Sequence, residues 1–143
     1  MKTIIYIIGV FIIIIIAFFF YMYLRIPDLG PNVSVVEIYS SNFGEKVFIK
    51  RKVWGVTGNH EITVVSKSDN KSFEPNDDNE YVFKGSPIFY NFINDTLNIY
   101  VPLESKKPIG MTTKIKINQI VLSNPKLMNL MHDYKEKGLR KVE

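Results

Sequence analysis

The chain has 143 residues, with 18 Lys and Arg against 14 Asp and Glu, and it contains no cysteine. This length suffices for one compact domain and little more. The absence of cysteine excludes disulfides, thiolate catalysis and Cys-ligated zinc, and the two histidines, His60 and His132, are too few for a His-rich metal site.

The first residues form a long apolar run. Of the 21 side chains in Ile4–Leu24, 20 are apolar or aromatic, and the exception is Gly9. As a helix rising about 1.5 Å per residue, this run would span roughly 31 Å, which matches the hydrocarbon core of a bilayer. It is longer than a signal-peptide core, and no small-residue cleavage site follows it. The sequence therefore predicts an uncleaved transmembrane signal anchor over residues 1–25, with a cleaved signal peptide and a buried core helix as alternatives.

The charges that flank this run favour one orientation. Lys2 and the α-amino group precede it, and Arg25 is the only Lys or Arg between the end of the run and Phe43. Cytoplasmic flanks carry the excess of positive charge in single-span proteins. We therefore expect a single-pass membrane protein, with the lipid bilayer as a partner and the remainder of the chain outside the cytoplasm.

The residues after the run have a different composition. Residues 26–32 contain two prolines and a glycine, which is typical of a short stiff linker. Residues 33–143 are rich in Val, Ile, Phe and Tyr, while the only alanine of the chain is Ala17, inside the run. Because β-branched and aromatic residues favour strands, the sequence predicts a small mainly-β domain of about seven antiparallel strands, forming a sandwich or an open barrel.

Apolar and polar residues alternate with period two in the expected strands. Asn94-Asp95 lies between two such segments and predicts a two-residue hairpin turn, because both residue types tolerate the left-handed conformation. A second hairpin is expected to turn at residues 55–59. The expected strands are 33–39, 47–54, 60–66, 80–83, 88–93, 96–101 and 112–122.

The C-terminal segment has a helical pattern. Asn124 followed by Pro125 is typical of a helix start, and Gly138 is typical of the position after a helix end. The sequence therefore predicts one C-terminal amphipathic helix over residues 125–137, packed on its own sheet. Four apolar residues recur at helical spacing: Leu127, Leu130, Met131 and Tyr134.

Charge is unevenly distributed along the chain. Residues 25–104 carry 8 basic and 11 acidic side chains, whereas residues 105–143 carry 9 basic and 3 acidic ones. The basic segment could contact anionic lipid headgroups or an acidic partner. We interpret it instead as the solvent-facing side of a strand and a helix end. Nucleic acid is not an expected partner, because the part after the apolar run has a net charge of only +3 and is expected to be tethered.

Two short segments suggest metal chemistry but lack the rest of the required pattern. Gly58-Asn59-His60-Glu61 resembles one block of the metallophosphoesterases, yet the Asp-x-His block, the Gly-Asp block and the downstream histidines of that family are absent. An EF-hand is excluded because Glu74 would occupy its glycine position. A loose calcium site formed by Asp77, Asp78 and Glu80 is the alternative to a solvated loop. The sequence thus predicts no catalytic residue, no metal site and no cofactor.

One cluster is a candidate interaction patch: Lys50, Arg51, Lys52 and Trp54. Trp and Arg are common at interface centres, although adjacent cations also protect strand edges. The leading hypothesis is a membrane-tethered, non-enzymatic binding or accessory domain that faces the cell envelope and contacts another envelope or membrane protein. The alternatives are an immunity or inhibitor protein against a membrane- or envelope-acting toxin or hydrolase, and a small envelope hydrolase with a carboxylate or metal site.

Overall fold

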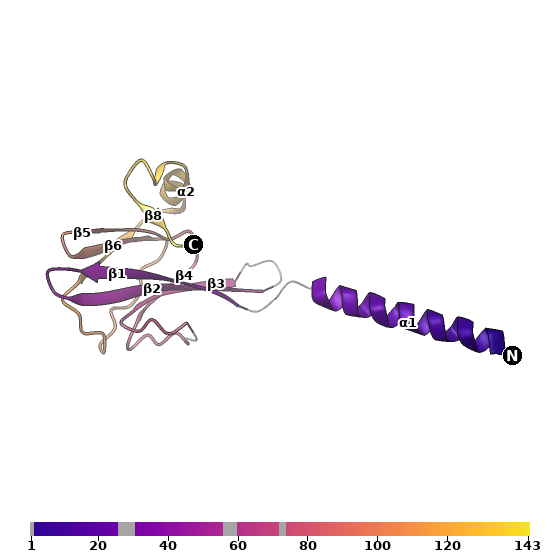
Figure 1. Ribbon diagram of the computed structural model, residues 1–143. Helices are drawn as coiled ribbons and strands as arrows, with labels where there is room; N and C mark the ends of the chain where they lie inside the picture. The colour runs from indigo at the N-terminus through magenta and orange to yellow at the C-terminus, as the bar shows by residue number, and fades with distance from the viewer. Residues whose placement is uncertain (1, 26–30, 56–59, 72–73) are drawn as a thin grey trace. The chain divides into compact units, whose positions relative to one another are not determined.

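The chain divides into two units, Met1–Gly30 and Pro31–Glu143. The computed structural model describes residues 2–25, 31–55, 60–71 and 74–143 (Figure 1). Most of the expected linker at 26–32 and of the expected turn at 55–59 therefore lies outside the described residues.

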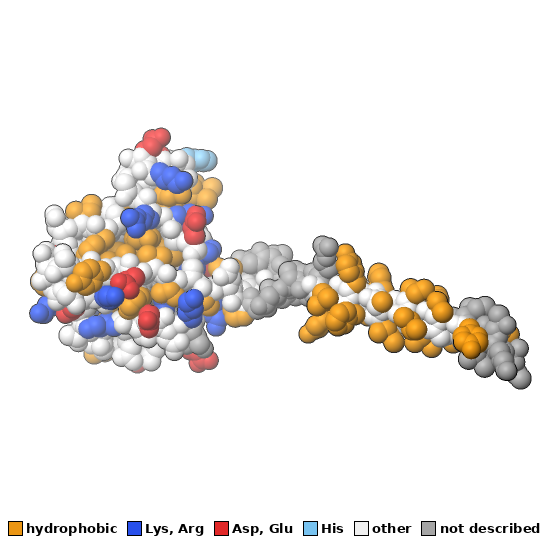
Figure 2. Space-filling model, in the orientation of Figure 1, with side chains coloured by type: hydrophobic (Ala, Val, Ile, Leu, Met, Phe, Trp, Pro, Cys, Tyr) orange, Lys and Arg blue, Asp and Glu red, His pale blue; other side chains and the backbone are white. Residues whose placement is uncertain are grey.

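The first unit contains helix α1 (Lys2–Arg25). Apolar side chains cover much of the described helix face seen in Figure 2, and residues 8–24 are all exposed. Within the described part of the chain, no helix has both the length and the hydropathy of a membrane span.

The second unit consists mainly of two four-stranded sheets, which confirms the prediction of a mainly-β domain. The first sheet has the strand order β1-β2-β3-β4, and all its neighbours are antiparallel. The second sheet has the order β7-β6-β5-β8. The first sheet comprises β1 (Asn32–Ser40), β2 (Glu45–Trp54), β3 (His60–Ser66) and β4 (Tyr81–Lys84); the second comprises β5 (Phe89–Ile93), β6 (Thr96–Val101), β7 (Lys116–Val121) and β8 (Arg140–Lys141).

Strand number and strand direction differ from the prediction. The described residues form eight strands instead of about seven, and β6 and β7 are parallel, with Thr96 opposite Lys116 and Val101 opposite Val121. The connection between them runs back along the domain before β7 begins. Alternation along a strand is the same in either direction, so the sequence pattern did not reveal the parallel pair. β8 was missed because it has two residues.

The core lies between the two sheets, which form two layers in Figure 1. The first sheet contributes buried residues such as Ile49 and Phe83, and the second contributes Leu97 and Ile99. Each set comes from alternate positions of its strand, so the period-two pattern decides which residues enter the core.

Helix α2 (Asn124–Asp133) covers the other face of the second sheet (Figure 1). It buries Leu127 and Leu130 against Phe89, as predicted for an amphipathic helix packed on its own sheet. The helix is shorter than the expected 125–137. Its end is followed by a turn in which the Leu139 N–H donates to the Tyr134 C=O at 2.8 Å and Gly138 adopts a φ of 69°. Gly138 thus follows the C-terminal turn, in the left-handed conformation that glycine accepts without strain.

The β5–β6 hairpin turns at Asn94 and Asp95, as predicted. Their φ angles are 49° and 57°, both in the left-handed region. The Asp95 carboxylate also accepts hydrogen bonds from the Ser40 hydroxyl at 2.5 Å and from the Asn42 amide at 2.6 Å. This turn of the second sheet is therefore bonded to the β1–β2 turn of the first.

These hydrogen bonds make stability depend on pH. Hydrogen bonds from Ser40 and Asn42 lower the pKa of Asp95 below its ordinary value of 3.8. A carboxyl with a lowered pKa in the folded state stabilises the fold above its unfolded pKa, and this contribution is lost as the pH falls through the folded pKa. We therefore expect the urea concentration at the unfolding midpoint to decrease as the pH is lowered below about 4. In Asp95→Asn, which has no carboxyl to protonate, the fall should be smaller; equal pH profiles for the two proteins would contradict this assignment.

Candidate functional site

The most unusual side chain of the domain is Lys50, in the middle of β2. Val47 and Ile49 of this strand point into the core, so Lys50 belongs to the outer face of the first sheet. An outer-face lysine is normally solvated. Lys50 is nevertheless only 1% exposed, and Val64, opposite it on β3, is fully buried. The connection between β3 and β4 accounts for this burial, because its residues, including Glu80, surround the lysine.

Lys50 forms an ion pair with Glu80, directly before β4. The Lys50 Nζ lies 3.2 Å from Glu80 Oε1, and the Glu80 side chain is 13% exposed. The second carboxylate oxygen, Oε2, is buried and accepts no hydrogen bond from the described residues. A buried carboxylate oxygen without a donor costs free energy, so a group that can donate to it would be stabilised there.

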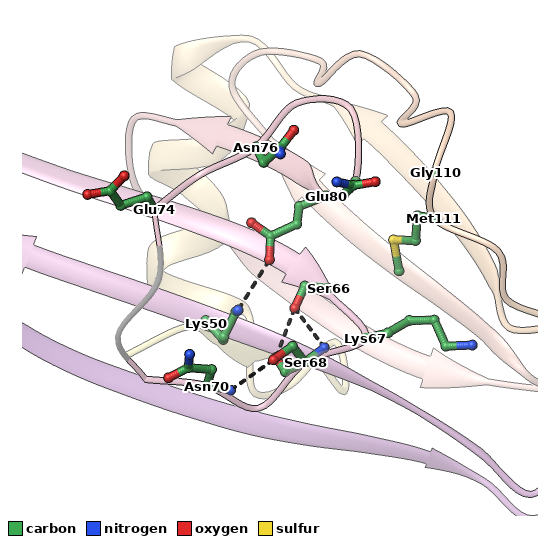
Figure 3. Close-up of a pocket in the computed structure, with 11 residues that line it drawn as sticks. Lys50, Ser66, Lys67, Ser68, Asn70, Glu74, Asn76, Glu80, Gly110 and Met111 are labelled. Atoms are coloured by element: carbon green, nitrogen blue, oxygen red, sulfur yellow. Dashed lines mark hydrogen bonds and ion pairs between the residues drawn. The ribbon is translucent and has the colours of Figure 1, made fainter.

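A pocket of about 400 Å³ lies beside this ion pair (Figure 3). We call it the polar pocket. Its lining comes from β2, from the end of β3 and from the β3–β4 and β6–β7 connections: Lys50, Ser66, Lys67, Ser68, Asn70, Glu74, Asn76, Asn79, Glu80, Gly110 and Met111.

Hydrogen bonds within the chain hold several of these groups. The Ser66 hydroxyl donates to the Ser68 C=O at 2.8 Å and accepts from the Ser68 N–H at 3.1 Å. The side-chain oxygen of Asn76 accepts from the Asp78 N–H at 3.0 Å, which forms a local turn. These groups are therefore preorganised, which reduces the entropy lost when a ligand binds.

Gly110 closes the pocket from the β6–β7 connection. Its N–H donates to the Asp78 C=O at 2.7 Å. A Cβ at this position would lie 2.0 Å from the side-chain oxygen of Asn79. Any larger residue here would force the Asn79 side chain to move.

The charges of the polar pocket balance. Two lysines and two glutamates line it. Lys67 and Glu74 extend away from the Lys50–Glu80 pair (Figure 3), and the Lys67 ammonium donates to the Thr112 C=O at 2.9 Å. The centre of the pocket therefore presents one ammonium, one carboxylate, serine groups and amides. This arrangement suits an uncharged ligand that both donates and accepts hydrogen bonds.

The four residues of the candidate interaction patch differ in how far they are buried and in which face of β2 they occupy. Lys50 is buried, and Arg51 points to the opposite face, where its guanidinium bonds Glu61 at 2.6 Å. Lys52 is half-buried, while Trp54 is 39% exposed and stacks on His60 with a ring separation of 5.8 Å. The four residues do not form one continuous surface, and a role for them in binding stays a prediction.

The other sequence candidates can be placed in the same way. Gly58 and Asn59 lie outside the described residues, and His60 begins β3. Of the calcium candidates, Glu80 is paired with Lys50. Among the described residues, no group of three His, Cys, Asp or Glu lies close enough together to hold a metal ion.

Sequence reasoning did not find the Lys50–Glu80 pair. The two residues are 30 positions apart, and Lys50 stands in a run of three cations that alternation alone assigns to strand faces. Charge is also mixed over the face shown in Figure 2, where acidic and basic side chains are interspersed. Only the folding of the β3–β4 connection brings the pair together.

Comparison with known proteins gives no match: no family model, curated protein or solved structure matches the chain.

The buried pair predicts an asymmetric response to mutation. Lys50→Met should lower the free energy of unfolding by about 3 kcal/mol, because it leaves the Glu80 carboxylate buried without its cation. The double variant Lys50→Met/Glu80→Met should recover most of this loss, since neither charge remains. Denaturant unfolding measures both changes.

The matched control is Lys46→Met in the exposed Lys46–Glu37 pair, whose side chains are 50% and 48% exposed. It should change stability by less than about 1 kcal/mol. A double variant as unstable as Lys50→Met would show that the packing of the lysine stem, and not the orphaned charge, causes the loss.

Proposed function

We propose that this protein is a membrane-tethered, non-enzymatic binding domain that faces the cell envelope. Two parts of the proposal have separate support. The tether rests on the composition of α1 and the orientation on its flanking charges, whereas the binding role rests on the polar pocket.

The composition of residues 4–24 supports the tether. This run has a single position that is neither apolar nor aromatic, and the described side chains of α1 are exposed around the helix. In water such a surface would be very unfavourable. In a bilayer it would be solvated by lipid, and the helix would satisfy its own backbone hydrogen bonds.

The polar pocket carries the binding role. Its decisive feature is the buried Oε2 of Glu80, which accepts no hydrogen bond from the described residues although the neighbouring Oε1 lies 3.2 Å from the Lys50 ammonium. A ligand or partner group that donates to this oxygen would remove the cost of leaving it unsatisfied. The bound group would be uncharged and polar, because a cation would meet Lys50 and an anion would meet Glu80.

The same contacts favour binding over hydrolysis. The Ser66 hydroxyl is engaged with Ser68, and the Lys50 ammonium is paired with Glu80. A nucleophilic serine needs a base within hydrogen-bond reach. Here both hydrogen bonds of the hydroxyl go to backbone groups, so its contacts hold the chain in place rather than activate an oxygen.

The tether predicts the behaviour of a single charged variant. Ile14 lies near the middle of the apolar run, and Ile14→Arg should disfavour insertion by about 3 kcal/mol on the translocon scale. Membrane fractionation should show a smaller membrane-bound fraction for Ile14→Arg than for Ile14→Leu. Equal fractions would place this residue away from the bilayer centre.

The binding role predicts which surface captures a partner. Full-length protein is cross-linked in membranes of its own host, solubilised in an uncharged detergent and recovered with its partner. Gly110→Ala should reduce recovery severalfold, because the new Cβ displaces the Asn79 side chain that lines the polar pocket. Ile109→Ala is the matched control, since this neighbouring side chain is 84% exposed and does not line the pocket.

Equal recovery with Gly110→Ala and wild type would contradict binding at the polar pocket. If the recovered partner is a toxin or hydrolase and its activity falls when the protein is added, the inhibitor alternative replaces the accessory role. If the protein itself converts the recovered component into a product, an enzymatic function replaces both the accessory and the inhibitor role.

A further inference from the structure

A second site is suggested where β8 begins beside β5. A groove of about 320 Å³ lies here, and we call it the edge groove. It is lined by residues of β1 and β5 and of the C-terminal segment, among them Ile38, Tyr39, Tyr90, Phe92, Gly138 and Arg140. No described residue lines both this groove and the polar pocket.

The backbone of β5 is incompletely paired beside this groove. β8 is antiparallel to β5 and pairs with Phe89 and Tyr90. The Val142 N–H donates to the Ile88 C=O at 3.0 Å, so the peptide groups of Ile88 point toward β8. Because alternate residues of a strand direct their peptide groups to the same side, the N–H and C=O of Phe92 also point that way.

The residue that should pair with Phe92 is engaged elsewhere. Continuing the β5–β8 register places Gly138 opposite Phe92. The Gly138 N–H instead donates to the Lys135 C=O at 3.0 Å, within the turn that follows α2. No described residue pairs with Phe92 on this side of β5. The end of the helix thus leaves one strand position vacant.

Side chains beside the vacant position give it an apolar base and a charge. Ile38 and Tyr90 are buried, and Phe92 is half-buried against the core. Arg140 is exposed and takes part in no ion pair among the described residues, whereas Glu37 at the other side is neutralised by Lys46 at 2.8 Å. Of the two charged residues that line the groove, Arg140 is therefore the one left without an ion pair among the described residues.

We propose that the edge groove binds an extended acidic segment of another protein, which adds a short strand to β5 at Phe92. The backbone of the segment would supply the hydrogen bonds that Gly138 does not, and an acidic side chain would pair with Arg140. A second copy of this chain is a poorer occupant, because edge-to-edge pairing would bring another Arg140 and Lys141 close to Arg140.

The test uses full-length protein in uncharged detergent micelles and two blocked five-residue peptides, Thr-Val-Glu-Val-Thr and Thr-Val-Lys-Val-Thr. Hydrogen exchange of the Phe92 amide, followed by NMR, should slow when the glutamate peptide is added. Arg140→Glu should weaken binding of the glutamate peptide by roughly fivefold and make the lysine peptide the better ligand. An N-methylated glutamate peptide, which lacks the strand donor, should not slow exchange.

Lys126→Glu is the matched control, because it reverses an exposed charge on α2 outside the groove. It should leave the peptide preference unchanged. Three outcomes would overturn the proposal: peptide binding without slower exchange at Phe92, no reversal of preference in Arg140→Glu, or no binding at millimolar peptide. Concentration-dependent dimers that protect Phe92 without peptide would assign the groove to a second copy.

Discussion

The polar pocket depends on the burial of one lysine on the outer face of a sheet. A solvated ammonium loses its hydration when covered, and this cost is offset only if an anion and further hydrogen bonds accompany it. Glu80 supplies the anion from the end of the β3–β4 connection. The connection therefore has to fold back over β2 and β3, and the polar pocket forms where it meets the β6–β7 connection at Gly110.

At the edge groove, the path of the chain from α2 to β8 is constrained in a similar way. Helix α2 packs on the second sheet through Leu127 and Leu130, and the chain must then return to β5 to complete that sheet. The turn that ends the helix uses the Gly138 N–H, so β8 starts too late to reach Phe92. Helix termination and strand pairing compete for the same backbone group, and the helix end prevails. The edge groove is the consequence of this competition.

Both candidate sites arise from long connections and chain ends, while the strands supply rigid support. This division is common, because a sheet holds its neighbours in place and leaves loops free to vary. The two sites also differ in chemistry. The polar pocket presents side-chain groups with balanced charges, whereas the edge groove presents backbone groups beside the exposed Arg140. A single partner could engage both only if it offered an uncharged polar group and an extended acidic segment.

The sequence by itself determined the elements that depend on local pattern. Alternation predicted strands β3 and β6 with their observed bounds, and Asn94-Asp95 predicted the tight hairpin turn. Helical spacing predicted the buried Leu127 and Leu130 of α2, although Met131 of the same expected face is 39% exposed. These features follow from side-chain periodicity and backbone preference, which act over a few residues. The composition of residues 4–24 likewise supplied the hypothesis of a membrane tether.

Only the tertiary structure decided the rest. The parallel pairing of β6 and β7, the two-residue strand β8, the Lys50–Glu80 pair and the vacant position at Phe92 each join residues far apart in the chain. Their formation depends on how connections fold over the sheets and on which groups compete for the same hydrogen bonds. Local pattern carries no information about either, because period two is the same for parallel and antiparallel strands and for solvated and covered faces.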